Sequence, residues 1–470
     1  GKREDEANVG WRQPFGPGRL TLTAALRGET KTTRSVLGQA ADEERIGEDE
    51  DFRESELGIR YVRPFGEDTT LEAMASRQRG RLRGVEDSRE GEDSERFEEN
   101  TDSGETIGRI ELTHARNARL SFNAALESAR NFLHSDNRLY RSGALVALPG
   151  ARTRIEERRT ETSAGLTWHP RKDWTVEAGM RLERSNLTQS GDIGRQRRFT
   201  YPKPRVAVRW VASESDQWRI SLSREVSQLV FEDFAASASL DGGTVSAGNA
   251  ELHPDRSWRS TLAWEHHFNE DAALTLGWTH DRIEDVVDRV LVTDGDEVFD
   301  APGNIGDGRR DTLALELSAP LPWQRLPGMR LRASLLWRDS RVTDPVTGRK
   351  RGISEEKPVE GEIELTQDLP GQRLNWGLLL EHIDERKTKY RYDRITTESE
   401  DMGWTLFAER RVGAHWRLRA DITDLFGREF RETRDKYQGT RADGTIRETE
   451  RRQRTSPGTI SVTIRRSIGG

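Results

Sequence analysis

Arginine and the two acidic residues dominate the side chains of this chain that could do chemistry. Its 470 residues include 75 Lys and Arg and 82 Asp and Glu, and nine of the 75 basic residues are Lys. A guanidinium group binds carboxylates and phosphates through paired, planar hydrogen bonds. The chemistry on offer is therefore the recognition of anions and the formation of ion pairs, rather than the making and breaking of bonds.

No pattern of residues points to catalysis. The chain has no Cys, which excludes disulfides, thiol catalysis and Cys-based zinc sites, and it has no GxSxG sequence. His266 and His267 are adjacent, so on a strand they point to opposite faces and cannot bind one metal ion together. The acidic sequences at 294–297 and 91–100 could hold a hard cation, but solvated loops are the commoner explanation. We predict that the protein is not an enzyme and has neither a cofactor nor a metal site.

The elements that must position the charged residues show apolar residues at every second position. This alternation is clearest in the segments 20–26, 174–182, 329–337, 416–422 and 460–464. A period of two indicates β-strands with two different faces. It excludes an amphipathic helix, which needs spacings of three and four.

The polar positions of these strands are expected to form an inward, wet face. The residues that the alternation assigns to it are Arg60, Arg109, Glu111, Glu127, Glu177, Arg181, Arg209, Arg219, Glu265, Glu316, Arg330, Arg332, Arg417 and Arg419. Two interpretations stay open. The face either binds a plug or guides a substrate, or it is a ladder of cross-strand ion pairs that satisfies itself.

The connections between strands are expected to differ in length at the two ends of the sheet. Short polar turns are predicted at 14–18, 66–68, 169–173, 212–217, 269–271, 369–371 and 412–415. Long charged loops are predicted on the other side, for example at 83–103 and 384–398, and the segments 43–52 and 86–102 are charged enough to be poorly ordered when isolated. Short turns at one end and long loops at the other are typical of outer-membrane barrels.

Tryptophan occurs repeatedly beside the short turns. The residues concerned are Trp168, Trp174, Trp210, Trp218, Trp376 and Trp416. An indole ring prefers the membrane interface, where its apolar body lies in lipid and its N–H faces water. We predict an aromatic girdle on the periplasmic side, although the strand preference of Trp is an alternative explanation.

Composition agrees with a membrane barrel. Hydrophobic residues make up 33% of the chain and charged residues 33%, with a net charge of −7. No apolar run reaches the roughly 18 residues of a membrane helix, whereas a barrel strand needs apolar residues only at alternate positions. The sequence thus predicts an all-β fold, a large antiparallel transmembrane β-barrel of about 19–22 strands, as one domain over 1–470. No basic face indicates nucleic acid.

Several motifs resemble one protein family. GNAELHPDRSW (248–258), PKPRVAVRW (202–210) with WRISLSREVSQLVFEDF (218–234), DITDLF (421–426) and SPGTISVTIRRSI (456–468) occur in the order and spacing of the barrel of TonB-dependent outer-membrane receptors. The resemblance covers the chain from about residue 165 to its end, and it is weaker before that.

The resemblance implies a receptor in the outer membrane of a Gram-negative bacterium. It would take up a scarce nutrient such as an iron–siderophore complex. Its partners would be outer-membrane lipid, a small-molecule or metal-chelate ligand, and the TonB energy-coupling system acting through a plug domain. The motifs of the plug are not in this chain, and we expect a plug and the first strands upstream of it. The alternative is a plugless passive pore or a structural barrel subunit of an envelope assembly.

Overall fold

Strands make up most of the computed structural model, which describes residues 1–38, 43–240, 243–294, 297–321, 327–413 and 415–466. One sheet contains 22 strands, and two smaller sheets contain four each. The predicted all-β fold class is confirmed. Three of the 22 strands are only two to four residues long, and the other 19 are long strands, as the alternation predicted.

Helical structure is minor among the described residues. It consists of three 3₁₀ turns, η1 (Phe231–Phe234), η2 (Pro370–Gln372) and η3 (Arg441–Asp443). None of the described helices has the length and apolar character needed to cross a membrane.

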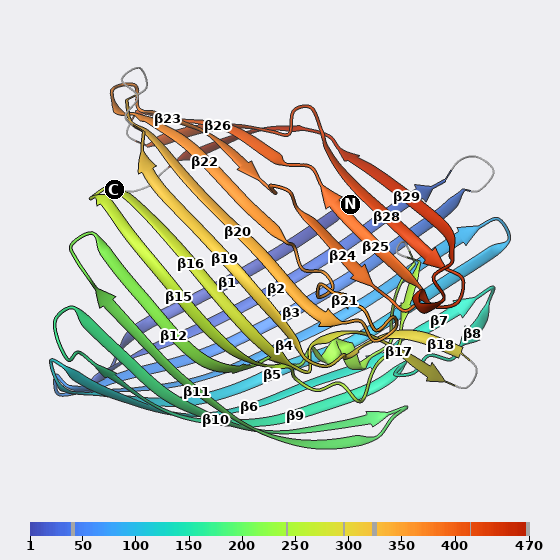
Figure 1. Ribbon diagram of the computed structural model, residues 1–470, viewed down its shortest axis with the longest axis horizontal. Coiled ribbons are helices and arrows are strands. Elements are labelled where there is room, and N and C mark those ends of the chain that lie inside the picture. Colours follow the sequence, from blue (N-terminus) through green and yellow to red (C-terminus); the bar gives the residue numbers. More distant parts are fainter. Residues whose placement is uncertain (39–42, 241–242, 295–296, 322–326, 414, 467–470) are drawn as a thin grey trace. The chain divides into compact units, whose positions relative to one another are not determined.

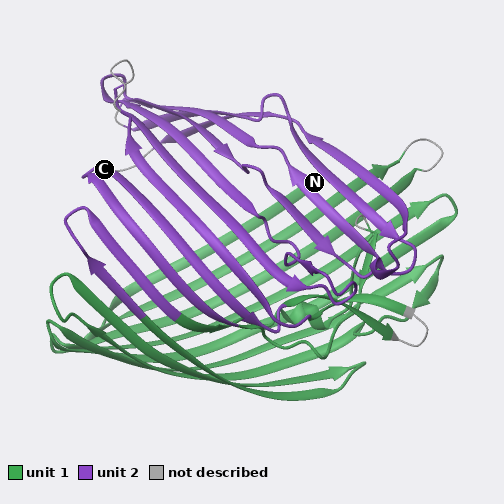
Figure 2. Ribbon diagram, in the orientation of Figure 1, with its two compact units in different colours: residues 1–206, 223–256, 287–304 green, residues 207–222, 257–286, 305–470 purple. Residues whose placement is uncertain are grey.

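The chain divides into two compact units (Figure 2), which are described separately. Unit 1 comprises residues 1–206, 223–256 and 287–304, and unit 2 comprises residues 207–222, 257–286 and 305–470.

Unit 1 contains a run of long antiparallel strands, each paired with the next (Figure 1). The strands of this run are β1 (Lys2–Phe15), β2 (Gly18–Leu37), β3 (Glu44–Phe65), β4 (Thr69–Glu90), β5 (Asp93–Asn117), β6 (Leu120–Asp136), β9 (Arg152–Trp168) and β10 (Trp174–Gly191). The short strand β7 (Arg138–Arg141) pairs with β5, and β8 (Ala144–Val146) pairs with β7. The strands β11 (Arg195–Val211) and β12 (Asp216–Val226) contain the unit boundaries.

A small sheet and the connection around it form a cap in unit 1. Its strands are β13 (Ser237–Ser239), β14 (Thr244–Ser246), β17 (Val287–Asp294) and β18 (Glu297–Asn304). Phe234 and Leu252 of the 227–255 connection pack with Leu133, Ile155 and Leu187, which project from β6, β9 and β10. This apolar core fixes the connection against the wall strands of the same unit.

Unit 2 contains a second antiparallel run with the pairing β16–β19–β20–β22–β23–β26–β27–β30. Its strands are β15 (Arg256–Asn269), β16 (Ala272–Glu284), β19 (Gly308–Pro320), β20 (Met329–Thr343), β21 (Lys350–Arg351), β22 (Val359–Leu369), β23 (Leu374–Glu381), β26 (Gly403–Val412), β27 (Trp416–Thr423) and β30 (Thr459–Arg466). A separate four-stranded sheet consists of β24 (Arg386–Tyr390), β25 (Arg394–Glu400), β28 (Arg428–Tyr437) and β29 (Ile446–Ser456).

Each run has one apolar face and one charged face. In unit 1, Ile110 lies opposite Leu126, and both side chains are exposed. In unit 2, Leu315 lies opposite Leu335 on the same kind of face, while Glu316 and Ser334 lie opposite each other on the other face. Large apolar side chains left on a surface in continuous rows indicate a face that contacts something other than water.

The predicted short turns are confirmed apart from 412–415, in which residue 414 lies outside the described residues. The strand pairs β1–β2, β3–β4 and β9–β10 are joined at 16–17, 66–68 and 169–173, and two further short connections lie between β15 and β16 and between β22 and β23. We call this the short-turn end of the strands, and the opposite end the long-connection end.

The predicted long loops were wrong at two places. Segment 83–103 forms the paired ends of β4 and β5, and 384–398 contains β24 and β25. Opposite charges face each other across these strands: Arg96 contacts Asp87 at 3.0 Å, and Lys387 contacts Glu398 at 3.0 Å. Cross-strand ion pairs favour a charged hairpin over a loop.

The segments 43–52 and 86–102, predicted to be poorly ordered when isolated, lie within strands β3 to β5 of the folded chain from residue 44 onward, apart from a tight turn at 91–92. Their order in isolation stays a prediction. Lys31 of β2 contacts Glu48 of β3 at 2.9 Å, which shows how this charged segment is held in the sheet. Residues 295–296 of the acidic turn and 467–468 of the final motif lie outside the described residues.

Candidate functional site

The charged face of unit 1 carries a network of ion pairs. Arg109 lies opposite Glu127 in the pairing of β5 with β6. Its guanidinium contacts Glu111 at 2.8 Å and Glu127 at 3.6 Å. Arg60 pairs with Glu72 at 2.6 Å on the neighbouring strands. The structure thus brings the predicted residues Arg60, Arg109, Glu111 and Glu127 to one face and gives each arginine a carboxylate partner.

A buried lysine continues this network. Only 7% of the Lys203 side chain is exposed, and its ammonium group contacts Glu161 and, at 2.8 Å, Glu183. Arg181 contacts Glu161 at 3.7 Å, whereas Glu177 is exposed and forms no ion pair with any described residue. Lys203 was missed by the sequence analysis. The alternation that placed Arg209 inward, six residues later on the same strand, also carries Lys203 and could have identified it.

The charged face of unit 2 has the same character. Arg332 lies opposite Glu364 and contacts it at 2.9 Å. Arg219 contacts Glu265 at 3.0 Å. Arg419 contacts Asp421 at 2.7 Å.

The remaining predicted residues of unit 2 make weaker contacts. Arg330 approaches Asp271 at 3.6 Å and Arg417 approaches Glu409 at 3.9 Å. Arg209 donates a hydrogen bond to Gln217 at 3.3 Å. Glu316 shares the face but forms no ion pair with any described residue. These contacts are the ones that a self-satisfying ladder would make, and a role toward a plug or a substrate stays a prediction.

The six predicted girdle tryptophans lie at strand ends. Trp168 is the last residue of β9, Trp174 the first of β10 and Trp416 the first of β27. The others, Trp210, Trp218 and Trp376, lie within three residues of a strand end. All six ends are at short turns, and their position at a membrane interface stays a prediction.

Unit 1 contains several cavities, one of which has a volume of about 730 Å³. Another lies among the connections at the long-connection end. This cavity has a volume of about 610 Å³, which is in the usual range for small-molecule sites. It is lined by four stretches of chain, residues 137–152, 192–193, 248–251 and 292–293. We call it the connection pocket. Asn137, Arg138, Arg152, Asp192 and Glu251 supply its polar groups.

Two glycines allow the connections around this pocket to pack closely. Gly150 has a positive φ of 79°, and a Cβ there would lie 2.9 Å from the Phe234 carbonyl oxygen. A Cβ on Gly248 would lie 2.1 Å from the same oxygen. Any larger residue would push the 248–251 stretch away from the 137–152 stretch.

The motif GNAELHPD, found in the sequence, has a clear structural role. Asn249 donates a hydrogen bond to the Pro302 carbonyl oxygen at 2.8 Å. Arg197 donates to the carbonyl oxygens of Ala250 and Leu252. The motif therefore fixes one wall of the connection pocket to β11 and β18. Asn137 fixes another wall of the pocket, because its side-chain amide donates a hydrogen bond to the Ala236 carbonyl oxygen. No motif in the sequence marks Asn137.

Ion pairs add to a small apolar core, Ile283, Val286 and Val342 with Ile353 packed against it, in fixing the connections of unit 2. The Asp344 carboxylate, with 2% of its side chain exposed, contacts Arg351 at 2.6 Å and Arg441 at 2.8 Å. Both guanidinium groups also lie over the Tyr390 ring. Burial favours a raised pKa for Asp344, but hydrogen bonds from Arg441, the Thr347 backbone and Arg351 outweigh it and lower the pKa to about 2.

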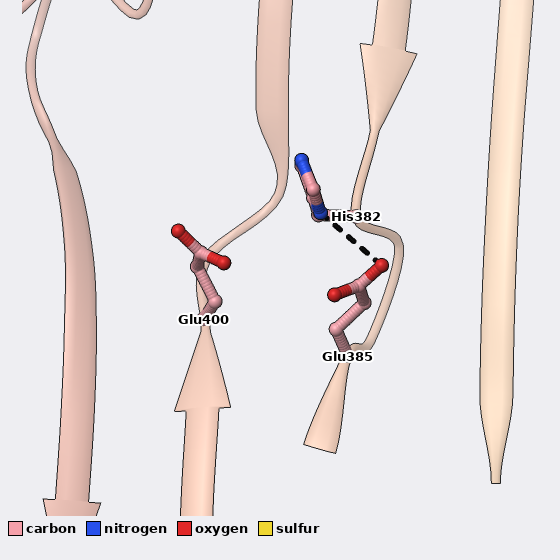
Figure 3. Close-up of side chains that lie close together, drawn as sticks. All are labelled: His382, Glu385 and Glu400. Atoms are coloured by element: carbon pink, nitrogen blue, oxygen red, sulfur yellow. Dashed lines mark ion pairs between the residues drawn. The ribbon is translucent and has the colours of Figure 1, made fainter. Parts of the chain in front are cut away.

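Three side chains in unit 2 come close enough to share a metal ion. His382, Glu385 and Glu400 place one ligand atom each within 4.8 Å of one another, and Figure 3 shows Glu400 at a strand end facing the connection that carries the other two. His382 contacts Glu385 at 3.1 Å. However, Lys357 contacts Glu385, and Arg428 contacts Glu400 at 3.2 Å. These cations already neutralise both carboxylates, so the cluster is explained without a metal ion.

Long antiparallel strands with one apolar and one charged face, joined by short turns at one end, define a membrane β-barrel protein. The chain belongs to the family described as "TonB dependent receptor-like, beta-barrel", which matches residues 5–447. Members of this family are outer-membrane β-barrels of Gram-negative bacteria. A search of curated proteins finds no match.

Solved structures of receptors share the fold. The ferric yersiniabactin uptake receptor FyuA from Yersinia pestis superposes with a TM-score of 0.66 at 11% identity, covering 99% of this chain and 71% of the receptor. The siderophore receptor PiuA from Acinetobacter baumannii gives 0.65 at 10% identity, with 99% and 78% covered. The alcaligin receptor FauA from Bordetella pertussis gives 0.55 at 13% identity, with 93% and 73% covered. At these identities the likeness shows the fold alone.

Proposed function

We propose that the chain is the barrel of an outer-membrane receptor that takes up a scarce nutrient such as an iron–siderophore complex. The observation that carries the proposal is the connection pocket, because it combines a suitable volume with polar side chains from four separate stretches of unit 1. Family membership supports the outer membrane of a Gram-negative bacterium as its location. The chemistry of the pocket is that of binding, since no described residues there combine a nucleophile with a base.

The wider features of this proposal come from the family. We further propose a single barrel domain over residues 1–470, with its apolar face toward lipid and its charged face toward a wet interior. Energy coupling by TonB would act through a plug domain, which the charged face would contact with Arg109, Glu111, Arg332 and Arg419 among others. The girdle tryptophans would mark the periplasmic interface.

A binding experiment tests the capture of a ligand. The purified protein is titrated calorimetrically with the ferric complexes of a catecholate and of a hydroxamate chelator, and with each iron-free chelator. We expect one ferric complex to bind and its iron-free form to bind more weakly. Leu145→Trp, which adds volume to the lining of the pocket, is expected to weaken binding at least about tenfold.

The matched control is Leu291→Trp. Leu291 lies on β17, next to the lining residue Val292, and its side chain is exposed outside the pocket. This variant is expected to bind as the parent protein does. Equal losses in both variants, or no binding of either ferric complex, would remove the connection pocket from the proposal.

A further inference from the structure

The apolar face of unit 1 changes character toward the long-connection end. On β3, β4, β6, β9 and β10 the alternating apolar residues give way to arginine. The arginines of this face are Arg53, Arg77, Arg79, Arg81, Arg130, Arg158 and Arg184. We call them the arginine rows. They continue the rows that hold Leu57, Ile59 and Leu126, so they share the face of the exposed apolar side chains.

The strand register places several of these arginines side by side. Arg77 lies opposite Thr106, Thr106 opposite Arg130, and Arg130 opposite Arg158. Neighbouring strands are about 4.8 Å apart, so Arg130 and Arg158 are direct cross-strand neighbours of like charge. Like charges at this spacing repel each other. Glu156 on the same face of β9 contacts Arg130 at 3.2 Å and offsets part of the repulsion, and an anion beside Arg158 would offset the rest.

Most arginines of the charged face have a carboxylate partner, but several in the arginine rows have none. Arg77, Arg158 and Arg184 form no ion pair with any described residue, and all three are exposed. Arg79 contacts the Phe132 ring at 6.0 Å and has no described carboxylate partner. The other three have carboxylate partners: Arg81 contacts Asp102 at 2.7 Å, Arg53 contacts Asp51 at 3.1 Å and Arg130 contacts Glu156 at 3.2 Å. The unpaired positive charge therefore gathers beside the apolar rows.

Two adjoining hollows lie on this face. Most of their lining residues come from β1 to β5, whose ribbons run side by side in Figure 1. The first, of about 590 Å³, is lined mainly by apolar side chains, including Val9, Trp11, Leu57 and Ile59, and by Arg77 at one edge. The second, of about 730 Å³, begins one row further along the same strands and includes Leu26, Arg53 and Arg79. The second hollow is also lined by Asp5, Glu6, Glu54 and Asp102, so its charges are mixed, and Arg77 and Arg79 lie where the apolar hollow meets it.

We propose that the arginine rows and the two hollows bind an anionic membrane lipid that carries phosphate groups. Its acyl chain would lie in the apolar hollow along Val9, Trp11 and Leu57. Its phosphates would receive hydrogen bonds from Arg77 and Arg79, with Arg158 holding a second group. Arginine suits phosphate because its planar fork binds two oxygens at once. The inference rests on the proposed function in one respect, because it requires this face of the strands to contact membrane lipid.

The test uses the full chain and a defined lipid. The protein is purified from membranes, exchanged into neutral detergent and titrated with diphosphorylated lipid A, and bound lipid is counted by native mass spectrometry. We expect saturable binding by the parent protein. Arg77→Gln with Arg79→Gln is expected to weaken it at least about tenfold, because both charge-assisted contacts are lost.

The matched control is Arg116→Gln with Arg119→Gln, which removes two exposed arginines at the short-turn end. It is expected to bind lipid A as the parent does, and circular dichroism and thermal midpoints confirm that all variants are folded. Inorganic phosphate at the same concentration is expected not to displace the lipid, since it lacks the acyl chain. Equal binding by both double variants, or displacement by phosphate alone, would overturn the proposal.

The ferric-chelate titration is run on the same preparations. The Arg77 and Arg79 variant should retain ligand binding, and the Leu145→Trp variant should retain lipid binding. A failure of lipid binding therefore overturns the lipid site without touching the receptor proposal, and a failure of chelate binding does the reverse.

Discussion

The apolar faces of the two units both lead into arginines toward their long-connection ends, but the rows that come before the arginines differ. In unit 1 the row across β4, β6 and β9 ends in Arg77, Arg130 and Arg158. In unit 2 the row across β16, β19 and β20 contains Trp278, Leu313 and Trp337, and Arg282, Arg309 and Arg341 lie opposite one another four residues further along the same face. Both patterns follow the same alternation of apolar residues.

The difference indicates two ways to finish an apolar surface. The Trp278 indole donates a hydrogen bond to Asp311 at 3.3 Å, so its polar edge is satisfied within the protein. The guanidinium groups of Arg77 and Arg158 have no such described partner. Unit 2 thus satisfies the polar edge of its tryptophan row with its own side chains before the arginines begin, whereas in unit 1 the unpaired arginines directly follow the apolar residues.

The connections differ in a parallel way. Unit 1 holds its cap through the apolar side chains of Leu133, Phe234 and Leu252. Unit 2 has a smaller apolar core around Val342 and also holds its connections through the buried carboxylate of Asp344 and two arginines. An apolar core is insensitive to pH, while a buried ion pair depends on the ionisation of its carboxylate.

The largest effect is expected where the cap of unit 1 loses its core. Phe234 is 1% exposed, and Phe234→Ala should destabilise the docked cap by about 3–5 kcal/mol, because it removes buried apolar area and leaves a cavity. Hydrogen exchange measured by mass spectrometry should show lost protection in residues 227–256. Phe426→Ala in unit 2, where the ring is 88% exposed, serves as the control. Unchanged protection in the Phe234 variant would mean that this core does not hold the cap.

Two neighbouring substitutions on β20 test whether the apolar and charged faces of unit 2 have different surroundings. Leu335→Arg should cost about 2–4 kcal/mol if the side chain contacts lipid near the bilayer midplane, and Ser334→Arg should be mild. Urea unfolding in lipid vesicles measures both. Equal costs would contradict the assignment of the apolar face to lipid.

Acid should loosen unit 2 before it affects the cap of unit 1. The pKa of Asp344 is lowered to about 2 from its ordinary value of 3.8. A lowered pKa stabilises the folded state above the unfolded value, and this stabilisation of about 2 kcal/mol is lost as the pH falls from about 4 to about 2. Pepsin should therefore begin to cleave residues 344–351 in that interval.

Asp344→Asn provides the control for the acid experiment, because it lacks the titrating carboxylate. Its 344–351 segment should be cleaved at pH 4 as readily as at pH 2. A parent protein that is equally resistant at both pH values would show that the ion pairs do not hold this connection.

The smallest effect concerns the boundary residues themselves. In the absence of anionic lipid, Trp278→Phe should cost about 1 kcal/mol through the lost hydrogen bond to Asp311. Arg158→Gln should stay within about 0.5 kcal/mol, since the exposed guanidinium has no described partner. Thermal unfolding in neutral detergent compares the two. A larger cost for Arg158→Gln would show that unit 1 also completes its boundary internally.

Much of the sheet of long strands could be predicted from the sequence, because its apolar residues recur at every second position. Leu335 and Ser334 were assigned to opposite faces by alternation alone, and the pairing of β19 with β20 agrees. The same rule failed at 83–103, where both faces are polar and the strand looks like a loop. Only the partner strand shows that Asp87 meets Arg96 there.

The sequence by itself determined the fold class, the two faces and the short turns, since each depends on neighbouring residues in one strand or turn. Tertiary structure alone decided the connection pocket, the arginine rows and the ion pairs of Asp344. Asn137 meets Ala236, and Asp344 meets Arg441. The chain segments that supply these contacts lie about a hundred residues apart, and a local period carries no information about which distant segments the fold will bring together.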